Sequence, residues 1–247
     1  MDQRDGCLSP YRVLDLTDEK GLYCGKLLGD MGADVVLVEP PGGHPARNRG
    51  PFYKGQIHPE KSLYWFALNT SKRSITLDLE CPDGQALFRD LVKTAHFVIE
   101  SYPPGHLDRL GLGYESLAQI RSDMVVTSIS PFGSTGPYAN RRGSDLVGQA
   151  TGGLVYVCGE AGRPPVRVAS DQAYFQASVQ AGIGSLIAHY HRLMTGEGQH
   201  VDVSIQQAVV GGMGIGGPHQ DWFLNHIIHQ RVGIPFHQGP VRGVAPR

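Results

Sequence analysis

The sequence predicts an α/β fold built on a doubly wound, parallel sheet. Strand-like and helix-like segments alternate along much of the chain, and the strand-like segments 34–38 and 124–130 are apolar almost throughout. Strands that are buried on both faces of a parallel sheet have this composition. The alternation matches repeated strand–helix–strand units, which place helices on both faces of one sheet.

The expected elements follow in order along the chain. We expect strands at 11–16, 34–38, 74–79, 96–100, 124–130 and 201–205, and helices at 19–31, 83–93, 114–120, from Asp171 to Thr195, after Ile205 and at 221–231. The helix after Asp171 is rich in alanine, glycine and serine, which predicts close packing against another backbone. We expect residues 1–205 to form one Rossmann-like large domain and 206–247 a helical linker. The tail, 233–247, shows no capping element, so we expect the chain to be truncated before a small second domain.

Composition excludes several classes of protein. The net charge of -1 provides no field that would favour nucleic acid or an anionic membrane. The four cysteines are scattered and form no CxxC pair, which argues against structural zinc or a redox dithiol and suits a reducing compartment. No apolar run opens the chain or reaches bilayer-spanning length. We therefore expect a cytoplasmic protein with no metal and no nucleic-acid or membrane partner.

Two long Pro/Gly-rich connections, 40–61 and 131–143, mark candidate sites. Loops of this length are often functional. The second follows a predicted strand directly, as does the segment 100–102. Ligands of open α/β sheets bind at the carboxyl ends of the strands. Both loops and this segment are therefore candidates for ligand contact.

Several local motifs leave their function open. Gly212, Gly214 and Gly217 fit the dinucleotide fingerprint by letter, but they follow a helix rather than a strand. His189 and His191 lie two residues apart on a predicted helix and so point to different faces, and the pair His226 and His229 has workable spacing but no nearby acid or cysteine cluster of a metal site. Lys72 and Arg73, and separately Arg109, are either ordinary surface cations or contacts to an anionic phosphate.

Asp171 lies directly after an extended segment and before the long helix. Aspartate at a helix start is most often an N-cap, and its position alone favours that role. The helix dipole would keep the carboxylate ionised. An ionised, positioned carboxylate can also attack an activated acyl group and form a mixed anhydride. Both roles are compatible with the pattern.

Five ordered motifs together resemble the class III CoA-transferases, also called the CaiB/BaiF family. The motifs are VLDLT with GDMGADVVLVEPPGG, LNTSKRSITLDL, ESYPPGHLDRLGLGYE, SISPFGSTGP, and the aspartate that precedes TGEGQHVDVSIQQA. The resemblance runs from about Tyr11 to the end of the chain.

The resemblance implies an acyl-CoA substrate and a small organic acid as its partner, a homodimer of two interlocked chains, and no metal. It implies that Asp171 is the nucleophile, which would pass through an aspartyl anhydride and an aspartyl-CoA thioester. By position in the motifs, the resemblance implies CoA contacts from Lys20, Gly21, Leu77, Ser101, Tyr102 and Arg109, and acyl or acid contacts from Tyr64 and Phe132.

Two departures from the family pattern bear on the reaction. Members that act as 2-methylacyl-CoA racemases carry a histidine in a Gly-His-Asp sequence, where this chain has Ser144. Serine cannot supply the second base of a racemase. Members that act on formyl-CoA and oxalate tend to have tyrosine where Phe132 stands. CoA transfer is therefore the expected activity, and the alternatives are a racemase or epimerase that uses Asp171 as a single base and a non-catalytic CoA-binding fragment.

Overall fold

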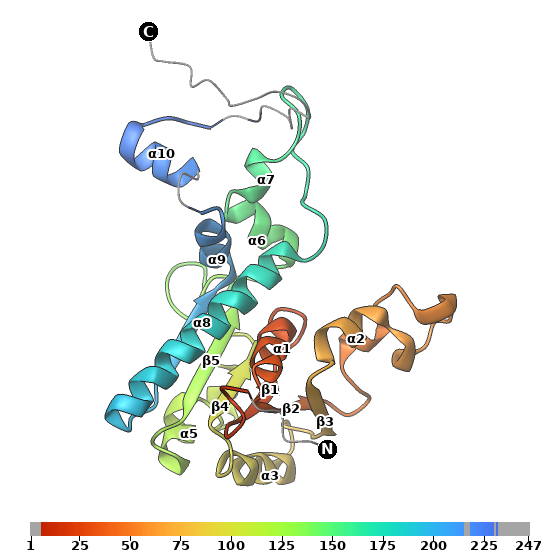
Figure 1. The fold of residues 1–247 in the computed structure, drawn as a ribbon, viewed down its shortest axis with the longest axis vertical. Helices are drawn as coiled ribbons and strands as arrows, with labels where there is room; N and C mark the ends of the chain where they lie inside the picture. The colour runs from red at the N-terminus through yellow and green to blue at the C-terminus, as the bar shows by residue number, and fades with distance from the viewer. Residues whose placement is uncertain (1–5, 215–217, 230, 232–247) are drawn as a thin grey trace.

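The computed structural model describes residues 6–214, 218–229 and 231 (Figure 1). Within these residues the chain forms one six-stranded sheet of β1 (Arg12–Leu16), β2 (Asp34–Glu39), β3 (Lys72–Thr76), β4 (Phe97–Glu100), β5 (Val125–Ser130) and β6 (His200–Ser204). Neighbouring strands are all parallel, in the order β3-β2-β1-β4-β5-β6. This is the strand order of the Rossmann fold, so the predicted fold class is confirmed.

Helices connect and cover the strands. The helices are α1 (Leu22–Asp30), α2 (Leu63–Asn69), α3 (Pro82–Val92), α4 (His106–Arg109), α5 (Tyr114–Ile120), α6 (Asp145–Thr151), α7 (Leu154–Val157), α8 (Gln172–Thr195), α9 (Ile205–Gly212) and α10 (Pro218–Asn225). None of the helices within the described ranges has the length and apolar character that a bilayer crossing requires.

The sheet has one apolar core on each face. Alternate residues of a strand point to opposite faces, so Val13 of β1 belongs to one core and Leu14 to the other. The first core is closed by α1, α8 and α9, and the second by α3, α4 and α5. Figure 1 shows α8 lying along the sheet on one side and α3 and α5 below it. The layers are those expected of a doubly wound sheet.

The small side chains of α8 bring it close to the strands. Ala177 and Ala181 are fully buried in the first core, and the Ser185 hydroxyl lies 2.7 Å from the Thr127 hydroxyl on β5. A Cβ atom at Gly184 would stand 2.7 Å from the Val201 side chain, which is closer than carbon atoms approach. The small residues therefore allow the close approach that the sequence predicts.

The structure differs from the sequence predictions mainly in the bounds of two elements and in four short helices. Strand β3 covers Lys72–Thr76 instead of 74–79, and its first residue, Lys72, pairs with the buried Asp15. Helices α2, α4, α6 and α7 were not predicted; each is short and buries few apolar side chains. Helix α10 covers Pro218–Asn225 rather than 221–231, and residue 230 lies outside the described residues. The sequence periodicity was too weak to set these boundaries.

The carboxyl ends of β1 and β4 mark the point where the strand order reverses. The segments that leave these strands touch each other, since the Ser101 hydroxyl donates to Asp18 Oδ1 at 2.8 Å and accepts the Asp18 N–H at 2.8 Å. Ligands of doubly wound sheets bind in the crevice at such a reversal. The fold thus places Ser101 where the sequence predicts a ligand contact.

Candidate functional site

Asp171 occupies the N-cap position of α8, but its side chain does not cap the helix. The Asp171 carboxylate makes no hydrogen bond to the N–H groups of the first turn. These N–H groups donate instead to Asp145 Oδ1, from Ala173 at 2.8 Å and from Tyr174 at 3.2 Å. The expectation that Asp171 acts as a cap is therefore wrong, because a carboxylate from α6 performs that role.

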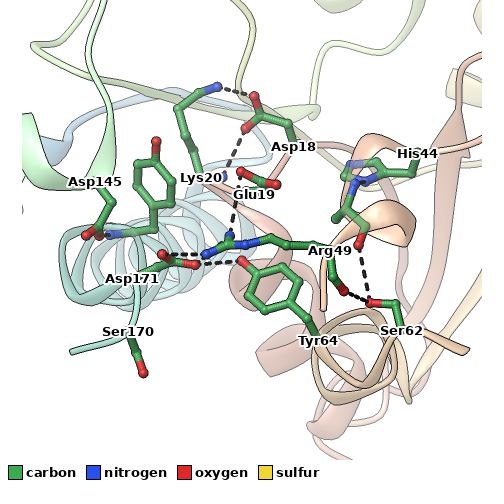
Figure 2. A network of polar contacts seen from close by, with 12 residues as sticks. Asp18, Glu19, Lys20, His44, Arg49, Ser62, Tyr64, Asp145, Ser170 and Asp171 are labelled. Carbon is green, nitrogen blue, oxygen red and sulfur yellow. Dashed lines mark hydrogen bonds and ion pairs between the residues drawn. The ribbon is translucent and has the colours of Figure 1, made fainter. Parts of the chain in front are cut away.

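The Asp171 carboxylate points instead toward the long loop between β2 and α2 (Figure 2). Arg49 contacts both of its oxygens, with Nη2 at 2.8 Å from Oδ1 and Nη1 at 2.7 Å from Oδ2. The Tyr64 hydroxyl, on α2, donates to Oδ2 at 2.9 Å. Asp171 is only 4% exposed, so these two side chains provide most of its polar surroundings.

The loop holds Arg49 firmly in this position. The guanidinium carbon of Arg49 stacks over the Tyr64 ring at 4.1 Å from its centroid, which adds a cation–π contact to the ion pair. The Arg49 carbonyl accepts a hydrogen bond from the Ser62 hydroxyl, which also caps α2 by accepting the Trp65 N–H. The Arg49 guanidinium and the Tyr64 hydroxyl therefore contact Asp171 from one segment, 49–64, whose own hydrogen bonds and stacking fix its conformation.

These contacts set the protonation states of Asp171 and Tyr64. Burial raises the pKa of Asp171, but the hydrogen bonds from Arg49 and Tyr64 outweigh burial, and the pKa lies below its ordinary value of 3.8. Burial and the neighbouring Asp171 charge raise the pKa of Tyr64. At neutral pH, Asp171 is thus an anion beside a protonated phenol.

Four of the residues expected to contact CoA line two adjoining cavities. Leu77, Ser101 and Tyr102 line a cavity of about 260 Å³ at the reversal point of the sheet. Lys20, Ser101 and Tyr102 line a second cavity of about 550 Å³, together with Arg141 and Arg142. Asp171 lines neither cavity. The link between the cavities and Asp171 is the segment before α1, where Lys20 reaches the larger cavity and the preceding Glu19 lies 3.6 Å from Arg49.

The three remaining predicted residues lie elsewhere around this region. Gly21 is packed, since a Cβ atom there would stand 2.5 Å from the Thr17 side chain. Arg109 is exposed on α4, contacts the Gly105 carbonyl and lines neither cavity. Phe132 stacks at a tilt on Tyr138 with 5.7 Å between ring centroids. The polar contacts of Asp171 include Tyr64 and exclude Phe132.

Arg49 and Asp145 were not predicted from the sequence. Arg49 lies in the loop 40–61 that was marked as a candidate site, but a single loop arginine carries no local pattern that identifies its partner 122 residues away. Asp145 follows Ser144, and Ser144 caps α6 in the ordinary way by accepting the Val147 N–H. The hydrogen bonds that Asp145 accepts from the first turn of α8 leave no local pattern in the sequence.

The other motifs have structural roles where the structure describes them. Lys72 pairs with Asp15 at 2.7 Å, with side-chain exposures of 1% and 0%, so its ammonium is enclosed and does not face a phosphate, whereas Arg73 pairs with Asp34 at the surface and is 63% exposed. Gly212 ends α9, and Gly217 of the fingerprint lies outside the described residues. His229 contacts a single acid, Asp221. Among the residues that the structure describes, no group of three or more metal-ligating side chains gathers.

The family model for CoA-transferase family III matches residues 8–232. The chain is 40% identical over 225 residues to the succinyl-CoA:(R)-benzylsuccinate CoA-transferase subunit BbsE of Thauera aromatica, covering 91% of this chain and 54% of that protein. It is 40% identical over 209 residues to the succinyl-CoA--D-citramalate CoA-transferase of Chloroflexus aurantiacus, covering 83% and 51%. The chain thus spans about half the length of these curated relatives.

The fold comparison agrees with the sequence comparison. The crystal structure of a CaiB/BaiF family protein from Brucella suis matches with a TM-score of 0.86 at 34% identity, covering 93% of this chain and 61% of that one. The match of the family model spans the sheet, the loop that carries Arg49, and the corner that carries Asp171. The chain belongs to CoA-transferase family III, the CaiB/BaiF family.

Proposed function

We propose that the protein transfers CoA from an acyl-CoA thioester to a carboxylic acid, with Asp171 as the nucleophile. The observation that carries the proposal is the state of the Asp171 carboxylate: it precedes α8 without being used to cap it, it is held ionised, and it is almost fully buried. A buried, ionised and oriented carboxylate is suited to attack an acyl carbonyl. Family membership supports the same chemistry.

The reaction would consist of four exchanges. An Asp171 oxygen attacks the thioester carbonyl, a C–O bond forms, the C–S bond breaks, and CoA leaves as the thiolate. The thiolate then attacks the Asp171 carbonyl of the anhydride, which gives an aspartyl-CoA thioester and releases the first acid. The acceptor carboxylate attacks the aspartyl carbonyl of this thioester, the C–S bond breaks, CoA leaves again as the thiolate, and a second anhydride forms. The thiolate finally attacks the acceptor's carbonyl, which releases the new acyl-CoA and restores the Asp171 carboxylate.

Tyr64 is placed to support these exchanges. Its hydroxyl proton is retained at neutral pH, because its pKa is raised, and already donates to Asp171 Oδ2. Each attack on a carbonyl places negative charge on an oxygen, and a positioned donor stabilises that charge. We infer that the phenol donates to the oxyanion that forms beside Asp171.

We infer that CoA binds along the two cavities at the carboxyl edge of the sheet. Ser101 and Tyr102 line both cavities, Leu77 lines the smaller one, and Lys20 lines the larger one. Gly21 and Arg109 complete the proposed CoA contacts by their position in the family motifs, and Phe132 is proposed near the acyl or acid substrate on the same ground. We also propose that the working unit is a homodimer, which light scattering would test.

Mass spectrometry of the protein incubated with an acyl-CoA tests the proposal. Both curated relatives described above carry succinyl-CoA in their names, so succinyl-CoA is the first donor to test. We expect a succinyl or CoA adduct on the peptide that contains Asp171, and its loss after hydroxylamine treatment. The Asp171→Asn variant is the matched control and should carry no adduct. An adduct elsewhere, or transfer that survives Asp171→Asn, would refute the proposal.

A racemase or epimerase is less well supported. The hydroxyl of Ser144 accepts the Val147 N–H at the start of α6, and Asp145 is occupied by the first turn of α8. Neither side chain is free to act as the second base of a racemase. Deuterium uptake at the α carbon of a 2-methylacyl-CoA, without exchange of the acid, would favour this alternative.

A further inference from the structure

The charges around Asp171 are balanced only while its carboxylate is ionised. Two cations face it, Arg49 in bidentate contact and Arg167 at 3.8 Å from Oδ1. The second anion is Glu19, 3.6 Å from Arg49. The ion pairs of Asp171 and Arg49 therefore comprise two positive and two negative side chains, and the neighbouring Lys20 and Asp18 pair with each other. Any step that removes the Asp171 charge leaves one positive charge in excess.

Acylation of Asp171 is such a step, and the inference that follows rests on the proposed function. When an Asp171 oxygen bonds to the acyl carbon and the thiolate leaves, the aspartyl side chain becomes an uncharged anhydride. The two Asp171 oxygens that the Arg49 guanidinium contacts at 2.7 and 2.8 Å then no longer carry a negative charge. The anion that remains beside Arg49 is Glu19, at 3.6 Å and 35% exposed, which compensates the partly buried guanidinium less well than Asp171 does.

We propose that Arg49 then binds a second carboxylate that the acyl group itself carries, so that the enzyme selects dicarboxylic acids and their mono-CoA thioesters. The free carboxylate of a succinyl-type chain attached to Asp171 lies a few bonds from the aspartyl oxygen. It can therefore take the place of the Asp171 oxygens in the fork of Arg49. The planar guanidinium matches a carboxylate in bidentate geometry.

The surroundings of Arg49 fit this role. The stacking on Tyr64 at 4.1 Å positions the guanidinium, and the hydrogen bond from Ser62 to the Arg49 carbonyl fixes the backbone, so little conformational freedom is lost when a carboxylate binds. The Arg49 side chain is 36% exposed, whereas that of Asp171 is 5% exposed, so Arg49 can be reached from outside the ion pair. Glu19 is farther away and 35% exposed, which makes it a weak competitor.

Binding to Asp171→Asn tests this inference without requiring any reaction. The amide removes the Asp171 charge as acylation does, and leaves Arg49 with Glu19 as its remaining anionic partner. Calorimetry should compare succinyl-CoA with butyryl-CoA, in which a methyl group replaces the free carboxylate. We expect succinyl-CoA to bind about tenfold to a hundredfold more tightly, the range of a charge-assisted hydrogen-bonded pair. The same comparison with free succinate and butyrate removes any contribution from CoA.

The control variants test whether Arg49 itself carries the preference for a second carboxylate. Adding Arg49→Gln to Asp171→Asn should reduce the preference to about twofold or less, and Arg49→Lys should restore part of it. Adding Arg167→Gln should leave most of the preference in place. Equal affinities in Asp171→Asn, or a preference that survives Arg49→Gln, would overturn the inference. Failure of the proposed function would appear separately, as the absence of an adduct on wild-type Asp171.

Discussion

The Asp145 carboxylate caps the helix that Asp171 precedes. Its Oδ1 accepts the N–H groups of Ala173 and Tyr174, and its Oδ2 accepts a hydrogen bond from Gln149 at 2.6 Å. Because one aspartate satisfies the first turn of α8, the other is free to face Arg49 and Tyr64. Asp145 thus stabilises the start of α8, and Asp171 is left for the proposed chemistry.

Removing this cap should destabilise the protein. Asp145→Ala deletes two hydrogen bonds to otherwise unpaired N–H groups, and we expect a loss of about 2–3 kcal/mol in the free energy of unfolding. Asp145→Asn keeps an acceptor oxygen and should lose about 1 kcal/mol. Urea denaturation measures both values. Equal losses for the two variants would show that Asp145 does not act through these hydrogen bonds.

The ionisation of Asp171 should depend on Arg49. In the wild-type protein the pKa of Asp171 lies below 3.8, because the contacts from Arg49 and Tyr64 outweigh burial. In Arg49→Gln, the bidentate contact and the positive charge that oppose burial are lost, and the pKa of Asp171 should rise above that value. Carboxyl-carbon NMR titration of the two proteins, with Asp171→Asn to assign the signal, measures the change.

The same shift predicts a pH dependence of stability. A carboxyl whose folded-state pKa is lowered stabilises the protein above its unfolded pKa, and this contribution is lost as the pH falls through the folded pKa. The stability difference between wild type and Asp171→Asn should therefore be constant from about pH 5 to 7 and shrink below about pH 4. A difference that grows on acidification would contradict the lowered pKa.

Substitution of Lys72 should lower the free energy of unfolding far more than substitution of its neighbour Arg73. Lys72→Met leaves the fully buried Asp15 without its cation, and we expect a loss of about 3–5 kcal/mol in the free energy of unfolding. Arg73 is 63% exposed in its pair with Asp34, so Arg73→Met is the matched control and should cost at most about 1 kcal/mol. Denaturant unfolding should rank the two variants in this order, and the reverse ranking would contradict the buried pair.

Glu100 should make the protein less stable as the pH rises. Burial raises the pKa of this carboxyl to about 7, although hydrogen bonds from Ser128 and the Tyr102 N–H oppose the shift. A raised folded-state pKa gives stability that is present below the unfolded pKa and is lost as the pH rises through the folded pKa. Unfolding measured between about pH 5 and 8 should show a decline of up to about 3 kcal/mol. Glu100→Gln, which resembles the protonated acid, should remove most of the decline.

The sheet could be predicted from the sequence, whereas part of the site could not. An apolar strand segment such as 34–38 indicates burial on both faces through its own composition. The small residues of α8 likewise indicate close packing through the composition of that helix. The partners of Asp171 depend on tertiary contacts. Tyr64 was identified through the family motifs, but Arg49 and Asp145 act across long sequence separations and match no local pattern.

The helix cap shows the same limit. An aspartate before a helix normally accepts the N–H groups of the first turn, and the sequence offered no sign of a competing acceptor. Asp145 supplies that acceptor only because α6 packs against the start of α8. Local rules therefore predicted the position of Asp171 correctly and the direction of its side chain incorrectly.

The pair formed by Arg49 and Asp171 joins segments that lie 122 residues apart. Contacts of such high sequence separation form only after the intervening chain has been brought together, which is slow compared with local structure. Neither half of the sheet can create the surroundings of Asp171 alone, since Arg49 comes from the β2 side and Asp171 from the side of β5 and β6. The titration of Asp171 is therefore also a probe of completed folding, and a partly folded chain should show an ordinary aspartate there.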